Sequence, residues 1–506
     1  MSGLGRARSA AVVGVSGTPV EIEAFVNQGL PGVALVGLAD ASLREAKDRV
    51  RAAVSNSGCK WPDGRVVLNL SPATMPKSGS SYDVAIAVAV LAASEKVPPH
   101  LLDECLFLGE LALDGRVRPV HGVLPSVMAA VEEGLTRVVV PRRNAAEAAL
   151  VPGVEVGAVD HLRDVIAWLA GERALDSVDD VTPSAVAPTG DGVDMADVVG
   201  QEEARHALEI AAAGGHHVFM SGPPGIGKTM LARRLPGILP PLTEAEALEA
   251  TVIHSVAGTL PTGGPLLVEP PFIAPHHSTS HTALVGGGTG MARPGAVSRA
   301  HRGVLFLDEC AEMGVKALES LRTPLEDGQT RVWRRDGVAT LPARFLLVLA
   351  ANPCPCAPAQ DVDCVCTAQV RRRYLGKLSG PLMDRVDLRV RMDPPGTAAL
   401  TGGVGEASAD IRARVVAARE AARDRWSEHG WTTNAEVPGS ALRVRYALPS
   451  TVTRPIGIYL RDGRVTARGA DRAIRLAWTL CDLRGGVTPS QDEVAQALMF
   501  RDRERV

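Results

Sequence analysis

A glycine-rich stretch between an apolar run and a helical pattern restricts the fold of this chain more than any other feature. It has the sequence Ser-Gly-Pro-Pro-Gly-Ile-Gly-Lys-Thr over residues 221–229 and follows a short apolar run at 217–220. Because its glycines lack Cβ atoms, backbone N–H groups can turn inward on a polyphosphate, and the following helix presents its positive end to the same anion. The pattern predicts a phosphate-binding loop between a strand and a helix.

The last residues of this loop have separate predicted tasks. We expect Lys228 to bridge the β- and γ-phosphates of a nucleotide and Thr229 to ligate Mg²⁺. The alternative is a glycine-rich turn that fits the pattern by chance, and the strand and helix around it argue against that. The predicted nucleotide contacts in this stretch are Gly222, Pro223, Pro224, Gly225, Ile226, Gly227, Lys228, Thr229 and Met230.

Two further apolar runs end in polar residues suited to the same site. Residues 303–307 precede Asp308 and Glu309, and residues 345–351 precede Asn352. Such runs are typical of parallel strands buried on both faces, whose carboxyl ends meet in one crevice. Asp308 suits the outer shell of Mg²⁺, Glu309 suits the base that activates water, and Asn352 can hold water or a γ-phosphate oxygen. Each could be an ordinary strand-end cap, but their joint occurrence predicts ATP hydrolysis with ATP and Mg²⁺ as cofactors.

Length and composition set broad limits on the class of protein. A chain of 506 residues predicts two or three domains, and its 46% hydrophobic and 22% charged residues are typical of a globular protein without a membrane-spanning stretch. The N-terminal stretch lacks the long apolar core of a secretory signal, so we expect a cytoplasmic protein with no membrane partner. The net charge of −3 leaves nucleic-acid binding to local basic patches, and an aromatic content of 3% disfavours a stacking platform for single strands.

The predicted fold class is α/β, in three parts joined by one linker. Residues 1–172 show strand patterns at 11–15, 33–36, 66–70 and 137–141, helical patterns at 40–55 and 82–93, and a hairpin at 109–117. Residues 173–194 have the composition of a linker. Residues 195–400 form the predicted parallel-sheet core, and 401–506 have helical periodicity typical of a lid.

Arginines gather at two places in the predicted core. Strand patterns at 329–334 and 338–343 form a hairpin with Arg331, Arg334 and Arg335 at or near its tip, where they could grip phosphates if subunits form a ring. The alternative is a solvated hairpin. The run Arg371, Arg372 and Arg373 is a second candidate DNA contact, or a solvated loop end.

Four of the eight cysteines lie within thirteen residues. Two Cys-x-Cys pairs, Cys354 with Cys356 and Cys364 with Cys366, have side chains suited to tetrahedral Zn²⁺. A reduced cysteine loop and oxidised pairs are the alternatives, because the spacing departs from the commoner Cys-x-x-Cys arrangement. The paired histidines at 276 and 277 lack partners at ligand spacing, so we expect a loop role for them rather than a metal site.

The N-terminal region resembles the protease domain of Lon and its relatives. The similar segments are Pro-Lys-Ser-Gly-Ser-Ser at 76–81, Gly-Glu-Leu at 109–111 and Arg-Val-Arg-Pro-Val at 116–120. Ser81 falls where that family has its nucleophile, but Leu124 stands where the activating lysine is expected. Without that lysine a serine hydroxyl is a weak nucleophile. We therefore expect a non-proteolytic domain of the same ribosomal-protein-type fold, in a structural or nucleic-acid-contacting role.

In its motif order the chain resembles the YifB/ComM family of magnesium-chelatase-like AAA+ proteins. The order is the Lon-like domain, phosphate loop, Asp-Glu strand, Asn-Pro-Cys-Pro-Cys loop, Gly-Pro-Leu-Met-Asp-Arg segment at 380–385 and helical lid. The resemblance implies that Gln201 lies beside adenine, that Arg385 reaches the neighbouring subunit's γ-phosphate, and that Arg468 senses phosphate from the lid.

The same resemblance implies a function and partners. It implies a homo-hexameric ring that hydrolyses ATP, acts on single-stranded or branched DNA and promotes branch migration in recombination or natural transformation, with recombination proteins as candidate partners. The alternatives are a motor subunit of a magnesium or cobalt chelatase, which would share every ATPase residue, and an ATP-dependent Lon-like protease, which the missing lysine disfavours.

Overall fold

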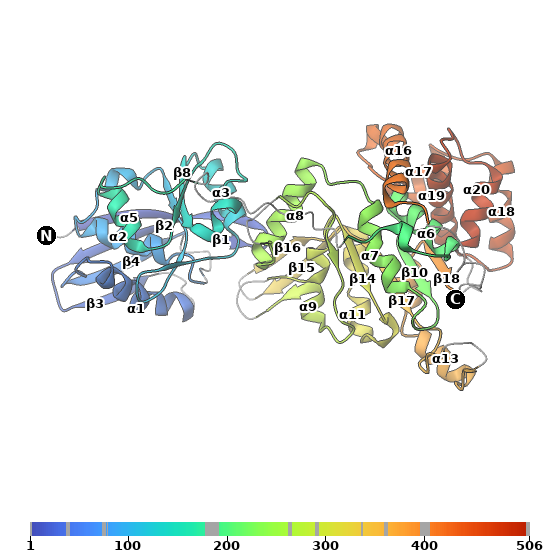
Figure 1. The fold of residues 1–506 in the computed structure, drawn as a ribbon, viewed down its shortest axis with the longest axis horizontal. Coiled ribbons are helices and arrows are strands. Elements are labelled where there is room, and N and C mark those ends of the chain that lie inside the picture. Colours follow the sequence, from blue (N-terminus) through green and yellow to red (C-terminus); the bar gives the residue numbers. More distant parts are fainter. Residues whose placement is uncertain are drawn as a thin grey trace.

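The computed structural model describes residues 3–36, 41–72, 77, 79–177, 192–261, 266–288, 293–334, 337–358, 363–394 and 405–501. The molecule has two parts that lie end to end: an N-terminal αβ half (described residues 3–177) and a longer C-terminal half (described residues 192–501). The last helices pack on the far side of the C-terminal half (Figure 1). This confirms the expected α/β class with a parallel-sheet core and a helical C-terminal region. Within the described ranges, no helix combines the length and apolar character needed to cross a membrane.

The N-terminal half is built on a seven-stranded sheet in the order β3-β4-β2-β1-β5-β8-β9. The β1, β2 and β4 strands pair antiparallel, and the other neighbours pair parallel. Its strands are β1 (Gly3–Val13), β2 (Ser16–Asn27), β3 (Gly32–Val36), β4 (Arg65–Ser71), β5 (Cys105–Phe107), β8 (Arg137–Pro141) and β9 (Glu155–Val159).

One predicted strand in this half was misplaced. The sequence pattern indicated a strand at 11–15, whereas β1 ends at Val13 and Gly14 and Val15 form the turn into β2. Gly14 has a φ of +65°, a conformation that glycine adopts at low cost, so the turn interrupts an apolar run that otherwise looks continuous.

Helices cover both faces of the N-terminal sheet. The α1 and α2 helices pack in one hydrophobic cluster with β1, β2 and β4, and every residue of α2 is buried. The α3 and α4 helices pack in a second cluster with β5, β8 and β9. The remaining elements of this half are α1 (Ala41–Asn56), α2 (Asp83–Ala93), the hairpin strands β6 (Glu110–Leu111) and β7 (Val117–Arg118), α3 (Val123–Glu132), α4 (Ala145–Ala148) and α5 (Leu162–Leu169).

The C-terminal half contains a five-stranded parallel sheet in the order β11-β14-β17-β10-β18. Alternate residues of β17 enter two different hydrophobic clusters: Val348 packs with α6 and α7, and Leu349 packs with α9 and α10. The sheet is therefore buried on both faces, as its continuous apolar runs predicted. The strands are β10 (Val218–Ser221), β11 (Phe272–Ile273), β14 (Val304–Leu307), β17 (Leu346–Ala351) and β18 (Leu388–Arg391).

Short helices and two hairpins surround this sheet. The predicted hairpin at 329–343 is present as β15 and β16, paired antiparallel. The elements are α6 (Glu202–Gly214), α7 (Lys228–Ile238), α8 (Glu244–Ala257), α9 (His281–Val285), β12 (Gly286–Gly287), β13 (Arg293–Pro294), α10 (Ala296–Arg299), α11 (Val315–Glu319), α12 (Arg322–Asp327), β15 (Gln329–Arg334), β16 (Gly337–Pro342), α13 (Ala368–Leu375) and α14 (Gly380–Met383).

The last part of the chain is helical and packs on α6 and α7. Its core is aromatic: Trp426 is fully buried and its ring meets those of Tyr446 and Trp478 edge to face. The helices are α16 (Ser408–Trp426), α17 (Gly439–Val444), α18 (Ser450–Arg461), α19 (Ala467–Leu483) and α20 (Gln491–Met499). The predicted domain boundaries remain predictions, and most of the predicted linker, residues 178–191, lies outside the described residues.

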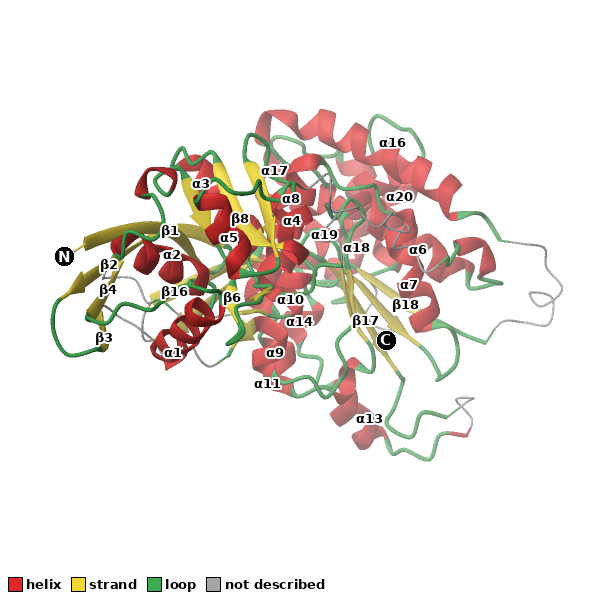
Figure 2. Cartoon of the chain, turned by 60° about the vertical axis from the view of Figure 1, so that its left-hand side comes forward, coloured by secondary structure: helices red, strands yellow, loops and turns green. Residues whose placement is uncertain are grey.

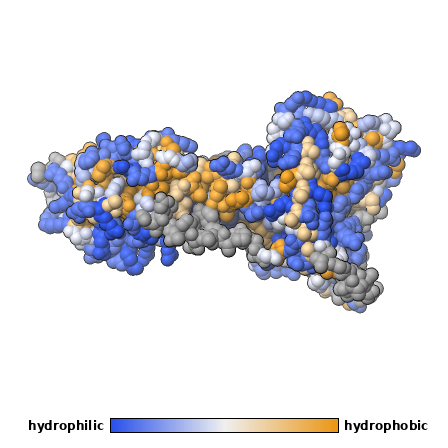
Figure 3. All heavy atoms as spheres, turned by 45° about the horizontal axis from the view of Figure 1, so that its top comes forward, coloured by the Kyte–Doolittle hydropathy of each residue, from blue (hydrophilic) through white to orange (hydrophobic). Residues whose placement is uncertain are grey.

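The two halves meet through α3 and α8, which pack against each other and lie side by side in Figure 1, while Figure 2 shows the same molecule turned by 60°. Val252 of α8 belongs to the hydrophobic cluster of the N-terminal half. The backbone N–H of Gly122 donates to the carbonyl of Ser255 at 3.1 Å, and the Ser255 hydroxyl donates to Glu147. On the face shown in Figure 3, hydrophobic atoms gather along the middle of the molecule, between the two halves.

Candidate ATP site and cysteine cluster

The glycine-rich stretch forms a loop between β10 and α7. Gly225 and Gly227 have φ angles of +74° and +102°, which side chains with a Cβ rarely adopt. A Cβ on Gly222 would lie 2.6 Å from the carbonyl oxygen of Met392. The helix begins at Lys228, so its N-terminal N–H groups face the loop. The predicted strand, loop and helix are all present.

Lys228 is buried and joins this loop to the end of β17. Its Nζ donates to the carbonyls of Gly222 at 2.6 Å and Pro223 at 2.9 Å, and to Oδ1 of Asn352 at 3.1 Å. Burial lowers the pKa of Lys228, because the charged amine loses hydration, although the negative charges of Asp308 and Glu309 act in the opposite direction. The amine and Asn352, 124 residues apart in sequence, are therefore already in contact.

Thr229 meets the acidic end of β14. Its hydroxyl donates to Oδ2 of Asp308 at 2.6 Å. The contact follows from the sheet: Ser221 of β10 pairs with Ala351 of β17, and Leu349 pairs with Leu307 of β14, so the three strands end at one edge. A hydroxyl and a carboxylate oxygen placed together suit Mg²⁺, which prefers oxygen ligands. The structure thus brings together five predicted residues: Lys228, Thr229, Asp308, Glu309 and Asn352.

Glu309 has a contact that the sequence did not reveal. Its Oε2 lies 2.9 Å from Nδ1 of His277, and both side chains are partly exposed. The φ angle of Glu309 is +47°, a strained value for a residue with a Cβ, and such strain is common where a fold aims a functional side chain. His277 follows β11, which pairs with β14, but the adjacency of these strands could not be read from sequence. The predicted loop role of the histidine pair agrees with this position.

Two further predicted nucleotide contacts lie at the rim of the site. Gln201 precedes α6, has a φ of +57°, and its Nε2 donates to the carbonyl of Asp393 at 2.9 Å. That contact ties the start of α6 to the segment after β18. Met230 lies in the first turn of α7 and is 37% exposed. Their predicted contacts with adenine and nucleotide remain predictions.

Arg385 lies at the N-terminal ends of the strands, opposite to the phosphate loop at their C-terminal ends. It precedes β18, whereas the phosphate loop follows β10, and the two strands are parallel neighbours with Val218 opposite Leu388. A four-residue strand spans roughly 13 Å, so this loop and Arg385 are separated by the length of the sheet. The Arg385 guanidinium instead contacts Glu326 of the same chain and donates to the carbonyl of Pro381 at 2.6 Å.

Arg468 is exposed in the first turn of α19. One turn later on that helix, Arg472 donates to the carbonyl of Arg385 at 2.9 Å and to Oδ1 of Asp387 at 2.6 Å. Residues four apart lie on one helix face. The two arginines predicted to act on phosphate therefore belong to one region, away from the phosphate loop of their own chain.

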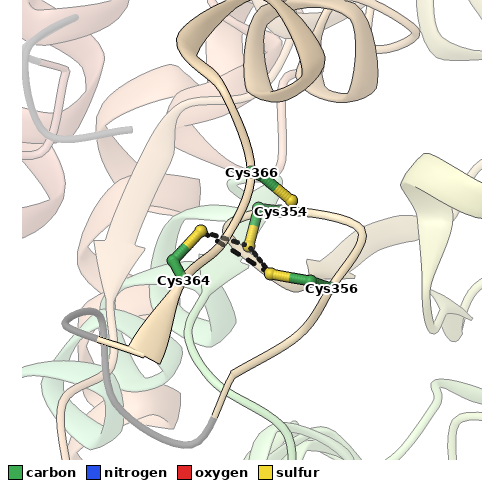
Figure 4. Close-up of side chains that lie close together, drawn as sticks. All are labelled: Cys354, Cys356, Cys364 and Cys366. Carbon is green, nitrogen blue, oxygen red and sulfur yellow. Dashed lines mark hydrogen bonds between the residues drawn. The ribbon is translucent and has the colours of Figure 1, made fainter.

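The four clustered cysteines converge in space. Figure 4 shows their side chains pointing toward one another, from the loop after β17 and from the segment before α13. The sulfur of Cys354 lies 3.3 Å from that of Cys356 and 3.4 Å from that of Cys364, and all four sulfurs lie within 4.8 Å of one another. Four ligands at a Zn–S distance of about 2.3 Å would place sulfurs about 3.8 Å apart. The donor set and its spacing fit a tetrahedral metal ion.

The basic candidates for DNA contact lie on the surface. Arg371, Arg372 and Arg373 are exposed on α13, which projects from the body of the C-terminal half in Figures 1 and 2. Arg331 is exposed on β15. The side chain of Arg334 and the whole of Arg335 lie outside the described residues.

Among the described residues of the N-terminal half, no lysine stands at the position predicted to activate Ser81. Leu124 is fully buried in α3, and its backbone N–H donates to Glu147 at 2.9 Å. The backbone carbonyl of Ser81 accepts a hydrogen bond from the N–H of Gly109 at 3.0 Å. The residue at the position of the expected lysine thus belongs to an apolar core.

The phosphate loop between strand and helix, with acids and an amide at the ends of adjacent parallel strands, defines a P-loop ATPase. Models of the magnesium chelatase subunit ChlI match residues 22–144 and 194–400, and a model of its C-terminal part matches 405–501. The chain belongs to the YifB/ComM family of magnesium-chelatase-like AAA+ proteins. Membership of this family implies ATPase activity.

Relatives from several bacteria match almost the whole chain. An uncharacterized protein of Mycobacterium tuberculosis is 58% identical over 501 residues, 98% of each chain. YifB of Escherichia coli is 39% identical over 498 residues, 98% of this chain and 96% of its own. Competence protein ComM of Haemophilus influenzae is 39% identical over 503 residues, 98% of this chain and 97% of its own. A Lon protease of Mycolicibacterium smegmatis is 31% identical over 163 residues, 31% of this chain and 20% of its own.

Proposed function

We propose that this chain is an ATP-driven motor that works on DNA as a ring of identical subunits, and that its activity is branch migration in recombination or natural transformation. The observation that supports assembly into a ring is the position of Arg385, which lies at the opposite end of the strands from the phosphate loop of its own chain. The observations that favour DNA are the exposed arginines of α13 and β15 and the 39% identity to a competence protein.

Each residue at the phosphate loop has a chemical task in this proposal. The loop N–H groups and Lys228 bind and orient the β- and γ-phosphates. Thr229 and Asp308 are the residues that would hold Mg²⁺, which supplies charge neutralisation at the phosphates. Glu309 accepts a proton from the attacking water, and Asn352, next to the Lys228 amine, orients that water or a γ-phosphate oxygen.

Among the described residues, neither arginine predicted to act on phosphate lies at the phosphate loop of its own chain. In phosphoryl transfer an added arginine stabilises the charge that develops on the transferred group. A head-to-tail ring would bring Arg385 of one subunit to the phosphate loop of the next, since heterologous contacts close into rings. In a single chain Arg385 is paired with Glu326, so we infer that assembly exchanges this contact for the γ-phosphate.

The cysteine cluster is proposed to hold structural Zn²⁺. Four thiolates provide a closed ligand set, with no position left for a reacting water. The cluster lies between β17, which ends next to Asn352, and α13 with its three arginines. A metal there would fix the projecting segment relative to the ATP site, so that the basic helix keeps its position while ATP is hydrolysed.

The direct test is ATP hydrolysis by the purified protein with and without forked DNA. We expect DNA to stimulate hydrolysis and the stimulation to fall as salt rises, because phosphate contacts release counterions. Glu309→Gln should bind ATP and lose turnover by about 10²- to 10⁴-fold. Turnover that survives this change would contradict the assignment of the base.

The ring is tested with two inactive variants. Arg385→Ala lacks the predicted trans-acting cation, and Lys228→Ala lacks a phosphate contact. Mixed rings would contain some interfaces with both an intact phosphate loop and an intact arginine. We expect the mixture to recover part of the ATPase activity, and a mixture as inactive as its components would contradict catalysis in trans.

A chelatase-type motor is the second candidate function, favoured by the description of the family model that matches residues 194–400. Such a motor would be stimulated by a tetrapyrrole, a divalent metal and a partner protein rather than by DNA. The cysteine cluster and the near-full-length similarity to a competence protein favour the DNA motor over this candidate. Stimulation by the tetrapyrrole mixture without any response to DNA would favour this candidate.

A further inference from the structure

Trp333 is unusual among the aromatic residues of this chain. All six tryptophans lie within the described residues, and Trp333 alone has an exposed side chain, at 75%. Among the phenylalanines and tyrosines, all of which are also described, only Phe25 is exposed, at 38%. A tryptophan side chain combines a large apolar face with an N–H donor, which is why tryptophan is enriched at binding interfaces.

The hairpin separates its two faces clearly. Trp333 pairs with Val338, and Arg331 pairs with Thr340, so these four residues share one face. That face is exposed at all four positions. Residues on the other face are buried: Thr330 is 4% exposed and Leu341 is fully buried. The buried face fixes the hairpin on the core, and the exposed face presents an aromatic ring two residues from a cation.

This combination of groups matches a single strand of DNA better than a protein. The hairpin sequence from Gln329 to Pro342 contains three arginines and one acidic residue, in a chain whose net charge is −3. Its local charge is therefore opposite to that of the chain as a whole and complementary to phosphates. An aromatic face stacks on any base, while a neighbouring arginine contacts the backbone, which is how proteins bind single strands without sequence preference.

We propose that Trp333 stacks on a base of single-stranded DNA, with Arg331 on an adjacent phosphate, so that the exposed face of the β15–β16 hairpin is a contact between motor and strand. This inference rests on the proposed DNA function. An aromatic content of 3% disfavours a continuous stacking platform within one chain. One exposed tryptophan per subunit is sufficient, however, when several subunits contact the same strand.

The indole ring of Trp333 is itself a fluorescent probe of the proposed contact. Oligo(dT) has no tryptophan-like emission, and stacking quenches indole fluorescence. We expect titration of oligo(dT) into the protein with a non-hydrolysable ATP analogue to quench the wild-type emission. Trp333→Phe keeps an aromatic side chain for stacking. We expect this variant still to bind fluorescently labelled oligo(dT), measured by the anisotropy of the label, while the DNA-dependent quenching of tryptophan emission disappears. A full quench in Trp333→Phe would overturn the assignment of the contact to this residue.

The affinity for oligo(dT) and its salt dependence distinguish the contribution of the Trp333 side chain from that of Arg331. Trp333→Ala should weaken oligo(dT) binding by about 5- to 150-fold, the range for loss of one stacked base, and leave the slope of affinity against salt unchanged. Arg331→Ala should lower that slope by about 0.7, as expected for one phosphate contact with a single strand. Phe25→Ala is the matched control, because it removes the other exposed aromatic side chain, and we expect wild-type affinity.

The outcomes separate this inference from the proposed function. If the wild-type protein binds and responds to DNA while Trp333→Ala binds oligo(dT) equally well, the inference fails and the motor proposal stands. If the wild-type protein does not bind DNA at all, both fail. If Trp333→Ala loses self-association but keeps its DNA affinity, the Trp333 side chain contacts another subunit rather than DNA, and this outcome also overturns the inference.

Discussion

Asp387 is a buried carboxylate where β18 meets the C-terminal helices, and its replacement by asparagine tests how that junction is held. Its side chain is 1% exposed, and its oxygens lie 3.1 Å from Nδ1 of His216, 2.6 Å from Arg472 and 3.6 Å from Arg501. Burial alone would raise the pKa of Asp387, but the charges and hydrogen bonds of Arg472, His216 and Arg501 outweigh it and hold the pKa well below the ordinary value.

Asparagine keeps the volume and removes the charge, so no cavity contributes to the loss. Arg501 is itself 4% exposed, and burial lowers its pKa to about 10. Without Asp387, Arg472 and Arg501 would remain as like charges with no anion between them. Removal of one partner from a buried ion pair costs about 3–5 kcal/mol. We therefore expect Asp387→Asn to raise the unfolded-to-folded ratio of the C-terminal half by more than about a hundredfold.

Urea unfolding followed by tryptophan fluorescence measures this loss, since the buried Trp426 and Trp478 lie in the C-terminal helices. Asp393→Asn is the matched control: that carboxylate is 69% exposed beside Arg391 and should contribute less than about 1 kcal/mol. A midpoint for Asp387→Asn equal to that of the control would refute the reasoning.

The pH dependence of the same measurement has a definite sign. A carboxyl whose pKa is depressed in the folded state contributes stability that is fully present above its unfolded pKa of about 3.9 and is lost as pH falls through the folded pKa. The difference between the wild type and Asp387→Asn should therefore be constant near neutral pH and shrink only in acid. A difference that shrinks between pH 8 and pH 6 would contradict the depressed pKa of Asp387.

Three other perturbations follow from the site. His277→Ala removes the contact to the candidate base and should lower kcat for ATP by about 10- to 100-fold with an unchanged KM, whereas His276→Ala should have little effect; equal losses in both would contradict a positioning role. Glu326→Gln frees Arg385 from its pair within one chain and should raise ATPase activity at low protein concentration by at most about fivefold, and a fall in activity would contradict that restraint. Cys364→Ser should remove about one zinc per chain in metal analysis of the purified protein, and an unchanged or absent zinc content in both proteins would exclude the proposed metal.

The parts of the site that are local in sequence could be predicted, and the parts that depend on strand order could not. The phosphate loop and the polar ends of β14 and β17 follow from the composition of short segments, because a buried parallel strand needs a continuous apolar run. His277 was assigned only a loop role, since its contact with Glu309 requires β11 to pair with β14. Periodicity within either strand carries no information about that pairing.

The same limit applies to the N-terminal half and the junctions. The strand predicted at 11–15 was displaced because the apolar pattern continues through the turn at Gly14, where only the backbone conformation marks the end of β1. The cluster around Asp387 unites residues from positions 216 to 501, each unremarkable alone. Exposure of Trp333 likewise depends on which face of the hairpin packs on the core, which alternation alone does not decide.

The α8 helix connects the N-terminal half to the candidate ATP site. It is the next helix in the chain after α7, which begins at the phosphate loop, and it precedes β11 and His277. Its outer face supplies Val252 to the core of the N-terminal half and Ser255 to Glu147. The two halves are therefore joined by a packed, hydrogen-bonded contact at α8, in the stretch of chain between the phosphate-loop helix and His277.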